Sequence, residues 1–221
     1  MTHKDFVNRR NNSIYNIVAD NQSILKNKYN LKIIYSNSSK LQNLSRAYGE
    51  MGKIYFIYQL YKKRIISSKY IGINHYRRYF NFTDNIPDLN KLFKNFDVIL
   101  NKPSFISRSI RESFCHGHIC EMYDEMIDII RVVKPEYYEV SKKISKSKKI
   151  YYCNIFIMKK RDFFNYCKFI FDILFEIDKR NNFTSDNDVL KYTKKYFNDS
   201  KESYRQSRLQ GYLAERASNI F

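Results

Sequence analysis

The sequence has few of the residues that interrupt regular structure: five glycines and three prolines in 221 residues, with no tryptophan. Because glycine and proline mark most tight turns, the bulk of the chain is expected to form helices and strands. Internal repeats are not evident. Long apolar runs are also missing, since no stretch without Asp, Glu, Lys or Arg exceeds nine residues. A bilayer-spanning helix needs roughly 20 such residues, so none is expected.

The N-terminus, MTHKDFVNRRNN, is charged and has none of the apolar character of a secretory signal. The sequence therefore predicts a cytoplasmic protein. Four cysteines in such a chain are expected to be thiols rather than disulfides. They are Cys115, Cys120, Cys153 and Cys167.

Acidic residues are scarce: 22 Asp and Glu stand against 40 Lys and Arg, a formal net charge of +18. The resulting positive field attracts phosphates on nucleic acid, anionic lipid or a nucleotide sugar. An AT-rich genome would produce a similar composition without selection for binding, so the charge alone identifies no partner. Because zinc-finger, RNA-recognition and leucine-zipper patterns are missing, no nucleic acid is expected as the partner.

Hydrophobic residues make up 43% of the chain and aromatic residues 17%, enough for a globular core and a single domain over residues 1–221. Short β-branched runs predict strands, and apolar residues at spacings of three and four predict helices. Residues 180–207 are polar and are expected to form a loop. Strands alternating with helices indicate an α/β domain with a mostly parallel central sheet. The predicted strands are 14–19, 31–35, 69–74, 96–100 and 150–158; the predicted helices are 44–64, 122–133, 163–177 and a last one from Leu209.

The string NHYRRYF, residues 74–80, follows a predicted buried strand. Ligands of open α/β sheets bind at the carboxyl ends of strands. Two adjacent arginines and a histidine at such a place suit a diphosphate, because a guanidinium group offers planar, bidentate donors. Surface ion pairs of Arg77 and Arg78 are the alternative.

Four segments of the chain resemble motifs of one bacterial family and follow one another in the same order as in that family. KYIGINHYRRYF resembles the hallmark of a domain long catalogued as of unknown function, found in capsular and exopolysaccharide loci and now regarded as glycosyltransferases that include galactofuranosyltransferases. YGEMGKIY, with Tyr48, Glu50 and Tyr55, resembles a family helix. YYCNIFIMKK, with Asn154, and RLQGYLAER, with Arg208, Gly211, Tyr212, Glu215 and Arg216, resemble two further motifs. The resemblance covers residues 40 to 221 and departs from the family in lacking tryptophan.

This resemblance implies a GT-A-like glycosyltransferase that transfers a hexose from a nucleotide-diphosphate sugar, in particular a UDP-sugar, to a polysaccharide or lipid-linked oligosaccharide acceptor. Contact with an anionic inner membrane face would be peripheral. Glu50 and Glu215 are the candidates for catalytic base or sugar-hydroxyl ligand, with ordinary helix-surface pairing as the alternative. The residues expected to bind donor or substrate are His75, Tyr76, Arg77, Arg78, Asn154, His118 and Arg208.

Three questions stay open in the sequence. Many GT-A enzymes hold Mn²⁺ or Mg²⁺ on an Asp-x-Asp motif, but the pair Asp186 and Asp188 lies in the predicted loop, so no metal ligands are assigned. The segment CHGHIC, residues 115–120, could be a zinc site, a substrate contact through His116 or His118, or a plain loop. A basic nucleic-acid-binding protein, or a catalytically inactive scaffold on the same fold, is the alternative function.

Overall fold

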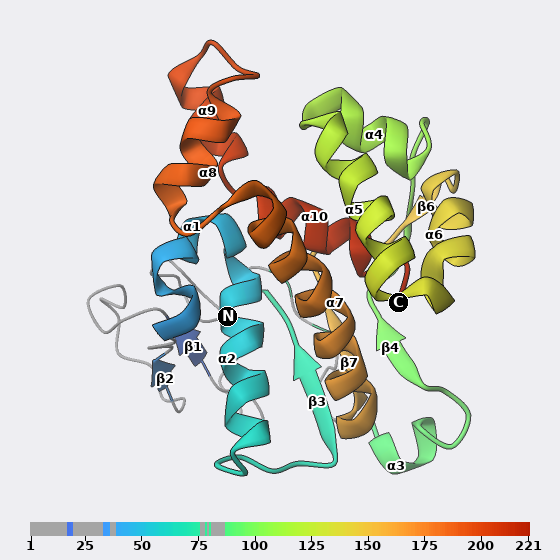
Figure 1. Cartoon of the computed structure of the whole chain (residues 1–221). Helices are drawn as coiled ribbons and strands as arrows, with labels where there is room; N and C mark the ends of the chain where they lie inside the picture. The colour runs from blue at the N-terminus through green and yellow to red at the C-terminus, as the bar shows by residue number, and fades with distance from the viewer. Residues whose placement is uncertain (1–16, 20–32, 36–38, 76–77, 79, 81–86) are drawn as a thin grey trace.

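The computed structural model describes residues 17–19, 33–35, 39–75, 78, 80 and 87–221 (Figure 1). Its centre is a three-stranded sheet in the order β3 (Tyr70–Ile73), β7 (Phe156–Lys159), β4 (Val98–Leu100). The long helix α7 (Lys160–Asn181) packs on this sheet and lies in front of it in Figure 1. Among the described residues, no helix is long and apolar enough to cross a membrane.

The central sheet corrects the prediction of a mostly parallel one. β7 is antiparallel to both neighbours, with Ile73 opposite Phe156 on one side and Val98 opposite Met158 on the other. The reason lies in the connection. After β4 the chain enters β5 (Ser104–Phe105), makes three helices and returns along β6 (Lys149–Ile150), which is antiparallel to β5. β7 follows β6 and so enters the sheet opposite to β4.

A second, parallel pair is formed by β1 (Ile17–Ala19) and β2 (Ile33–Tyr35). These strands coincide with parts of the predicted strands 14–19 and 31–35, of which residues 14–16, 31 and 32 lie outside the described residues. Val18 is buried and joins the main hydrophobic core.

The core gathers around α7, whose buried face carries the apolar residues that the sequence places there, among them Phe163, Ile170 and Ile177. α2 (Glu50–Lys62), α5 (Cys120–Val133) and α10 (Leu209–Ala217) all pack against α7. Ring contacts join these helices; Tyr55 of α2 lies edge-on to Phe171, with centroids 4.8 Å apart. The helices predicted at 122–133, 163–177 and from Leu209 are confirmed.

The predicted helix 44–64 is divided in two by Gly49. A 3₁₀ turn (Ser39–Leu44) leads into α1 (Ser45–Tyr48), and α2 begins after Gly49, whose φ is +53°. A positive φ is a conformation that only glycine adopts without strain. The break puts Glu50 at the very start of α2.

The segment 180–207 is helical rather than a loop. It contains α8 (Asp186–Thr193) and α9 (Ser200–Gln206), which pack on each other at the upper left of Figure 1. Both helices are short and polar, so apolar periodicity does not reveal them. Their starts are capped instead, by the Ser185 and Asp199 side chains.

Two further predictions are wrong. The strand at 96–100 is present as β4 but is not buried, because it lies at the edge of the sheet with Val98 and Leu100 about 40% exposed. The apolar run 150–158 is not one strand: a turn at Cys153 and Asn154 separates β6 from β7.

Cys115 and Cys120 form a disulfide, which corrects the expectation of four thiols. α4 (Ile110–Gly117) ends and α5 begins within three residues, so the two Cα atoms come within 4.3 Å. Cys153 and Cys167 are free. The remaining short elements are α3 (Leu89–Leu92), a 3₁₀ turn (Pro135–Tyr137) and α6 (Tyr138–Ser145).

Candidate functional site

Glu50 and Asn154, 104 positions apart in sequence, meet inside the protein. The Asn154 Nδ2 donates a hydrogen bond to Glu50 Oε1 at 2.8 Å, and Asn154 is only 7% exposed. Its Oδ1 accepts from Ser218 Oγ at 2.7 Å, and Ser218 is 2.9 Å from the Tyr166 hydroxyl. The amide is thereby held in one orientation, as a buried amide must be.

The turn before β7 has an unusual backbone. Cys153 and Asn154 have φ values of +75° and +46°, in the left-handed region that non-glycine residues seldom occupy. The turn aims the Cys153 amide N–H at Glu215 Oε1, 2.6 Å away. Strained residues of this kind persist where surrounding contacts hold them, and they cluster at functional sites. Glu215 is thus tied to the same turn that presents Asn154 to Glu50.

Two arginines lie next to the carboxylates of Glu50 and Glu215. Arg78 donates from Nη1 to Cys153 Sγ at 2.7 Å and is otherwise exposed. Arg208 precedes α10, and its guanidinium lies against Gly49, where an added Cβ would be 3.4 Å from Nη2. Both side chains are exposed, Arg78 beside the turn and Arg208 beside the start of α2.

Burial raises the pKa of Glu50 above its ordinary value, and the nearby charge of Glu215 raises it further. The hydrogen bond from Asn154 and the charge of Arg208 act in the opposite direction. A carboxyl group with a raised pKa holds its proton more readily than an exposed one, which suits a group that must take up a proton near neutral pH.

His118 lies apart from this cluster, at the end of α4. Its Nδ1 is 2.8 Å from Gln206 Oε1, and its ring lies between those of Phe114 and Tyr212. Burial lowers its pKa, and the positive charges of Arg216 and Arg205 lower it further. The contacts of His118 are thus with the protein itself. His116, in contrast, is exposed.

Asp186 and Asp188 do not fit a divalent cation. The Asp186 carboxylate accepts from the amide N–H groups of Arg46 and Ala47, which caps the start of α1. Asp188 accepts from Thr184 and Ser185 at the start of its own helix. The two carboxylates therefore serve two different helix ends. Across the described part of the chain, no group of three or more His, Cys, Asp and Glu is placed to hold a metal ion.

Four of the expected site residues thus lie around one turn: Glu50, Asn154, Glu215 and Arg78, with Arg208 beside Gly49. His75 is half-buried and pairs through its backbone with Arg78, at an N···O distance of 3.0 Å. Tyr76 and Arg77 lie outside the described residues.

Two participants escaped the sequence analysis. Cys153 holds Glu215 through its backbone N–H, and Ser218 fixes Asn154. Ser218 is three residues after Glu215, a spacing that puts both on one helix face, but it lies two residues beyond the motif that ends at Arg216. The role of Cys153 depends on its positive φ. Cys153 lies within an apolar run, and no residue pattern there predicts a positive φ.

Comparison with known proteins gives one family and one solved structure. The model of the family described as "Domain of unknown function (DUF4422)" matches residues 1–191. No curated protein matches the sequence. The apo structure of WbbM, a bifunctional glycosyltransferase, aligns with 95% of this chain at a TM-score of 0.66 and 20% identity. The chain spans 42% of the WbbM chain, and the two share a fold over that part.

Proposed function

Since the chain belongs to the family of the domain of unknown function DUF4422, and its fold is shared with part of a glycosyltransferase, we propose that it is itself a glycosyltransferase. Its donor is a nucleotide-diphosphate sugar, in particular a UDP-sugar that carries a hexose. Its acceptor is a polysaccharide or lipid-linked oligosaccharide of capsule or exopolysaccharide synthesis. The whole chain, residues 1–221, acts as a single domain.

The observation that carries this proposal is the convergence of distant segments. Glu50, Asn154, Glu215 and Arg78 come from the start of α2, the turn before β7, α10 and the segment that follows β3. A half-buried carboxyl group with a raised pKa lies next to exposed arginines, which combines a base with anion-binding groups. These are the two requirements of transfer from a nucleoside diphosphate.

In the proposed reaction, Glu50 accepts the proton of the acceptor hydroxyl. The hydroxyl oxygen then bonds to the anomeric carbon, and the bond from that carbon to the diphosphate oxygen breaks. Arg78 and Arg208, with Arg77 proposed from the sequence alone, stabilise the charge that develops on the leaving diphosphate. Glu215 and Asn154 bind sugar hydroxyls, and His75 and Tyr76 complete the donor site. His118 is proposed only to support Tyr212, because its ring already contacts Tyr212 and its Nδ1 is already hydrogen-bonded to Gln206.

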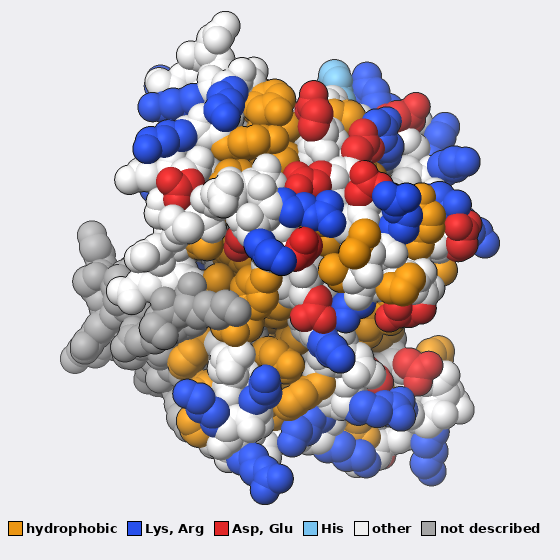
Figure 2. All heavy atoms as spheres, in the orientation of Figure 1, with side chains coloured by type: hydrophobic (Ala, Val, Ile, Leu, Met, Phe, Trp, Pro, Cys, Tyr) orange, Lys and Arg blue, Asp and Glu red, His pale blue; other side chains and the backbone are white. Residues whose placement is uncertain are grey.

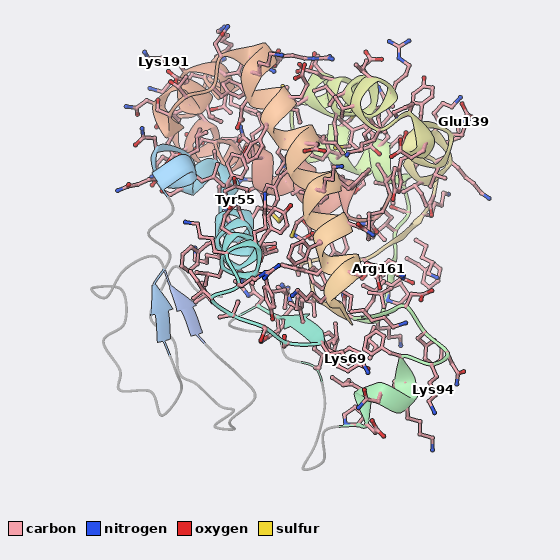
Figure 3. All side chains as sticks on the ribbon, turned by 60° about the horizontal axis from the view of Figure 1, so that its bottom comes forward. Tyr55, Lys69, Lys94, Glu139, Arg161 and Lys191 are labelled. Carbon is pink, nitrogen blue, oxygen red and sulfur yellow. A yellow bond between two sulfur atoms is a disulfide. The ribbon has the colours of Figure 1, made fainter. Side chains whose placement is uncertain are left out.

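A lipid-linked acceptor would require the protein to approach a membrane, and one end of the molecule suits this. The ends of α2, β3, α3 and α7 that meet there are rich in lysine and arginine; Figure 3 labels Lys69, Lys94 and Arg161 on it, and blue side chains line the lower edge of Figure 2. We call this the basic end. Its residues are Lys62, Lys63, Arg64, Lys69, Lys94, Lys160 and Arg161.

The test is thermal unfolding of the purified protein with a panel of nucleoside diphosphates and nucleotide sugars, with and without Mn²⁺. A ligand that binds the native state at 100 times its Kd stabilises it by about 2.7 kcal/mol. We expect one nucleotide sugar to raise the Tm of the wild type, and Arg77→Ala and Arg208→Ala to abolish the shift.

Arg131→Ala is the matched control, because Arg131 is an exposed residue of α5 that pairs with Asp128 on the same helix. It should keep the full shift. If no nucleotide stabilises the wild type while DNA or RNA binds in a salt-sensitive manner, the protein is a basic binding protein on this fold and the proposal fails.

A further inference from the structure

Asn154 lies between Glu50 and a cavity of 340 Å³, whose walls it helps to form. The cavity is partly open and is lined by β4, the segment before β7, β7 itself, the first turns of α7 and the residues after α10; it lies in the region between β4 and the C-terminal end in Figure 1. Small-ligand pockets occupy about 300–1,000 Å³, so there is room for a small molecule. Its aliphatic and aromatic lining comes from Val98, Leu100, Phe156, Met158, Tyr166 and Phe221.

Two polar atoms of this lining are buried and have no hydrogen-bond donor. Asn101 Oδ1 and Asp162 Oδ2 accept no hydrogen bond from any part of the chain that the structure describes. Buried polar atoms in folded proteins almost always have a partner, so an unpaired one needs an explanation. Both atoms are acceptors. A ligand that satisfies them must therefore offer O–H or N–H groups.

The charges around the cavity favour a ligand with neutral hydrogen-bond donors over a cationic ligand. Asp162 already pairs through Oδ1 with Arg161 Nε at 3.1 Å. Asp97, the other carboxylate of the lining, lies 3.9 Å from Lys159 Nζ. Because each carboxylate has a cationic neighbour, neither needs an ammonium group for charge balance. Hydroxyl groups satisfy the free acceptors without adding charge.

A sugar ring has this combination of properties: C–H faces that pack against aromatic and aliphatic side chains, and O–H groups at its edge. We propose that the cavity binds a sugar ring of the acceptor. This inference rests on the proposed glycosyltransferase function and names the subsite for its second substrate. Asn154, Ser218 and Tyr166 form a hydrogen-bonded wall of the cavity, and Glu50 lies directly behind Asn154. A sugar ring in the cavity is thus one side chain away from the proposed base, on the other side of Asn154.

Binding of a panel of methyl hexosides, measured by saturation-transfer NMR and titration without any nucleotide, tests the inference. We expect at least one hexoside to bind the wild type. Asn101→Leu should weaken that binding at least tenfold, because it removes one acceptor. The same variant should not lower the Tm, because it also removes a buried atom without a partner. Leu100→Trp, at a half-exposed position, should block the cavity.

Asn165→Leu is the control: the same substitution on an exposed position of α7, which should bind hexosides like the wild type. Nucleotide-induced stabilisation is measured on the same samples. If a nucleotide sugar stabilises the protein but no hexoside binds, or if Asn101→Leu and Asn165→Leu weaken binding equally, the cavity is not the acceptor subsite and the proposed function still stands. If neither ligand binds, both proposals fail.

Discussion

At the scale of single residues, the environment of Glu50 decides what its carboxyl group can do. The side chain begins a helix yet is withdrawn from water, with one hydrogen bond from Asn154 to its Oε1. Its raised pKa means that the folded protein favours the protonated form. The stability that this proton contributes is present below the ordinary pKa of 4.5 and is lost as the pH rises through the higher folded value.

The substitution Glu50→Gln should therefore separate activity from stability. The new amide can still accept the Asn154 hydrogen bond but cannot take up a proton, so we expect transfer activity to fall by about 10²–10⁴-fold. At pH 7 the variant should melt at a higher temperature than the wild type, and the difference should vanish below pH 4.5. Thermal unfolding from pH 4 to 8 and an activity assay check both. Glu136→Gln, at an exposed position, should change neither; a Glu50→Gln protein that keeps full activity would remove Glu50 from the mechanism.

His118 illustrates the opposite shift. Its pKa lies below the ordinary value of 6.5, because burial and two arginines disfavour the imidazolium form, while the hydrogen bond with Gln206 and the charge of Glu202 favour it. The unfolded chain takes up the proton first as the pH falls. Stability is therefore lost as the pH decreases below 6.5 towards the folded pKa.

Titration of the His118 imidazole signals by NMR should give a pKa below the ordinary value of 6.5. In His118→Asn, the decrease in Tm between pH 7 and pH 5 should be smaller than in the wild type. His116→Asn is the control, since His116 is exposed and should leave the pH profile of the Tm unchanged. A His118 that titrates at or above 6.5 would contradict this account.

At the scale of elements, the break between α1 and α2 positions the site. Gly49 has φ +53° and ψ −121°, and it brings Glu50 to the start of a helix with Arg208 beside it. A second glycine lies where α10 meets α1. A Cβ on Gly211 would be in van der Waals contact with the Tyr48 carbonyl oxygen, 3.5 Å away, so the space there fits a methyl group but no larger side chain without a shift of α10.

Gly49→Ala should destabilise the protein by about 1–3 kcal/mol, because alanine at this φ and ψ is strained. Relief of this strain would shift the start of α2, so the variant should also bind nucleotide more weakly. Gly52→Ala is the matched control, one turn further along α2, where an added Cβ would meet only Tyr48 Cβ at 3.9 Å. In a helix interior this change should stabilise by about 0.5–1 kcal/mol. Urea unfolding measures both; equal effects of the two substitutions would refute a special role for the break.

At the scale of the whole molecule, the net charge of +18 is spread over the sequence, but the fold gathers part of it at the basic end. Three of these residues, Lys62, Lys63 and Arg64, are exposed at the end of α2. A lysine or arginine near an anionic membrane surface contributes about 1 kcal/mol of binding free energy, and salt screens this attraction.

We expect the protein to sediment with phosphatidylglycerol vesicles at low salt and not with phosphatidylcholine vesicles. Replacing Lys62, Lys63 and Arg64 by serine should weaken vesicle binding by about 100-fold, from about 1 kcal/mol per residue. Serine at Lys143, Lys146 and Lys148 is the control, because these residues are exposed around the end of α6 and the change in charge is the same. If both triple variants lose binding equally, the attraction depends on net charge and not on the basic end.

The sequence alone determined those parts of the molecule that depend on local periodicity. Apolar residues three and four apart predicted α2, α5 and α7, because one face of each helix must be buried. Short β-branched runs predicted where β3 and β4 lie. The motif resemblance selected Glu50, Asn154, Glu215 and Arg208 before their positions were known.

Other features depended on contacts between distant segments, and only the tertiary structure decided them. β7 is antiparallel to β4 because of the path through β5 and β6. An apolar run in the sequence does not specify whether its strand pairs parallel or antiparallel with its neighbours. The turn at Cys153 and Asn154 requires a positive φ that the surrounding packing imposes. The raised pKa of Glu50 and the role of Asp186 as a helix cap likewise depend on residues far away in the sequence. Local sequence specifies which face of an element is buried, but burial against a particular partner is a property of the folded chain.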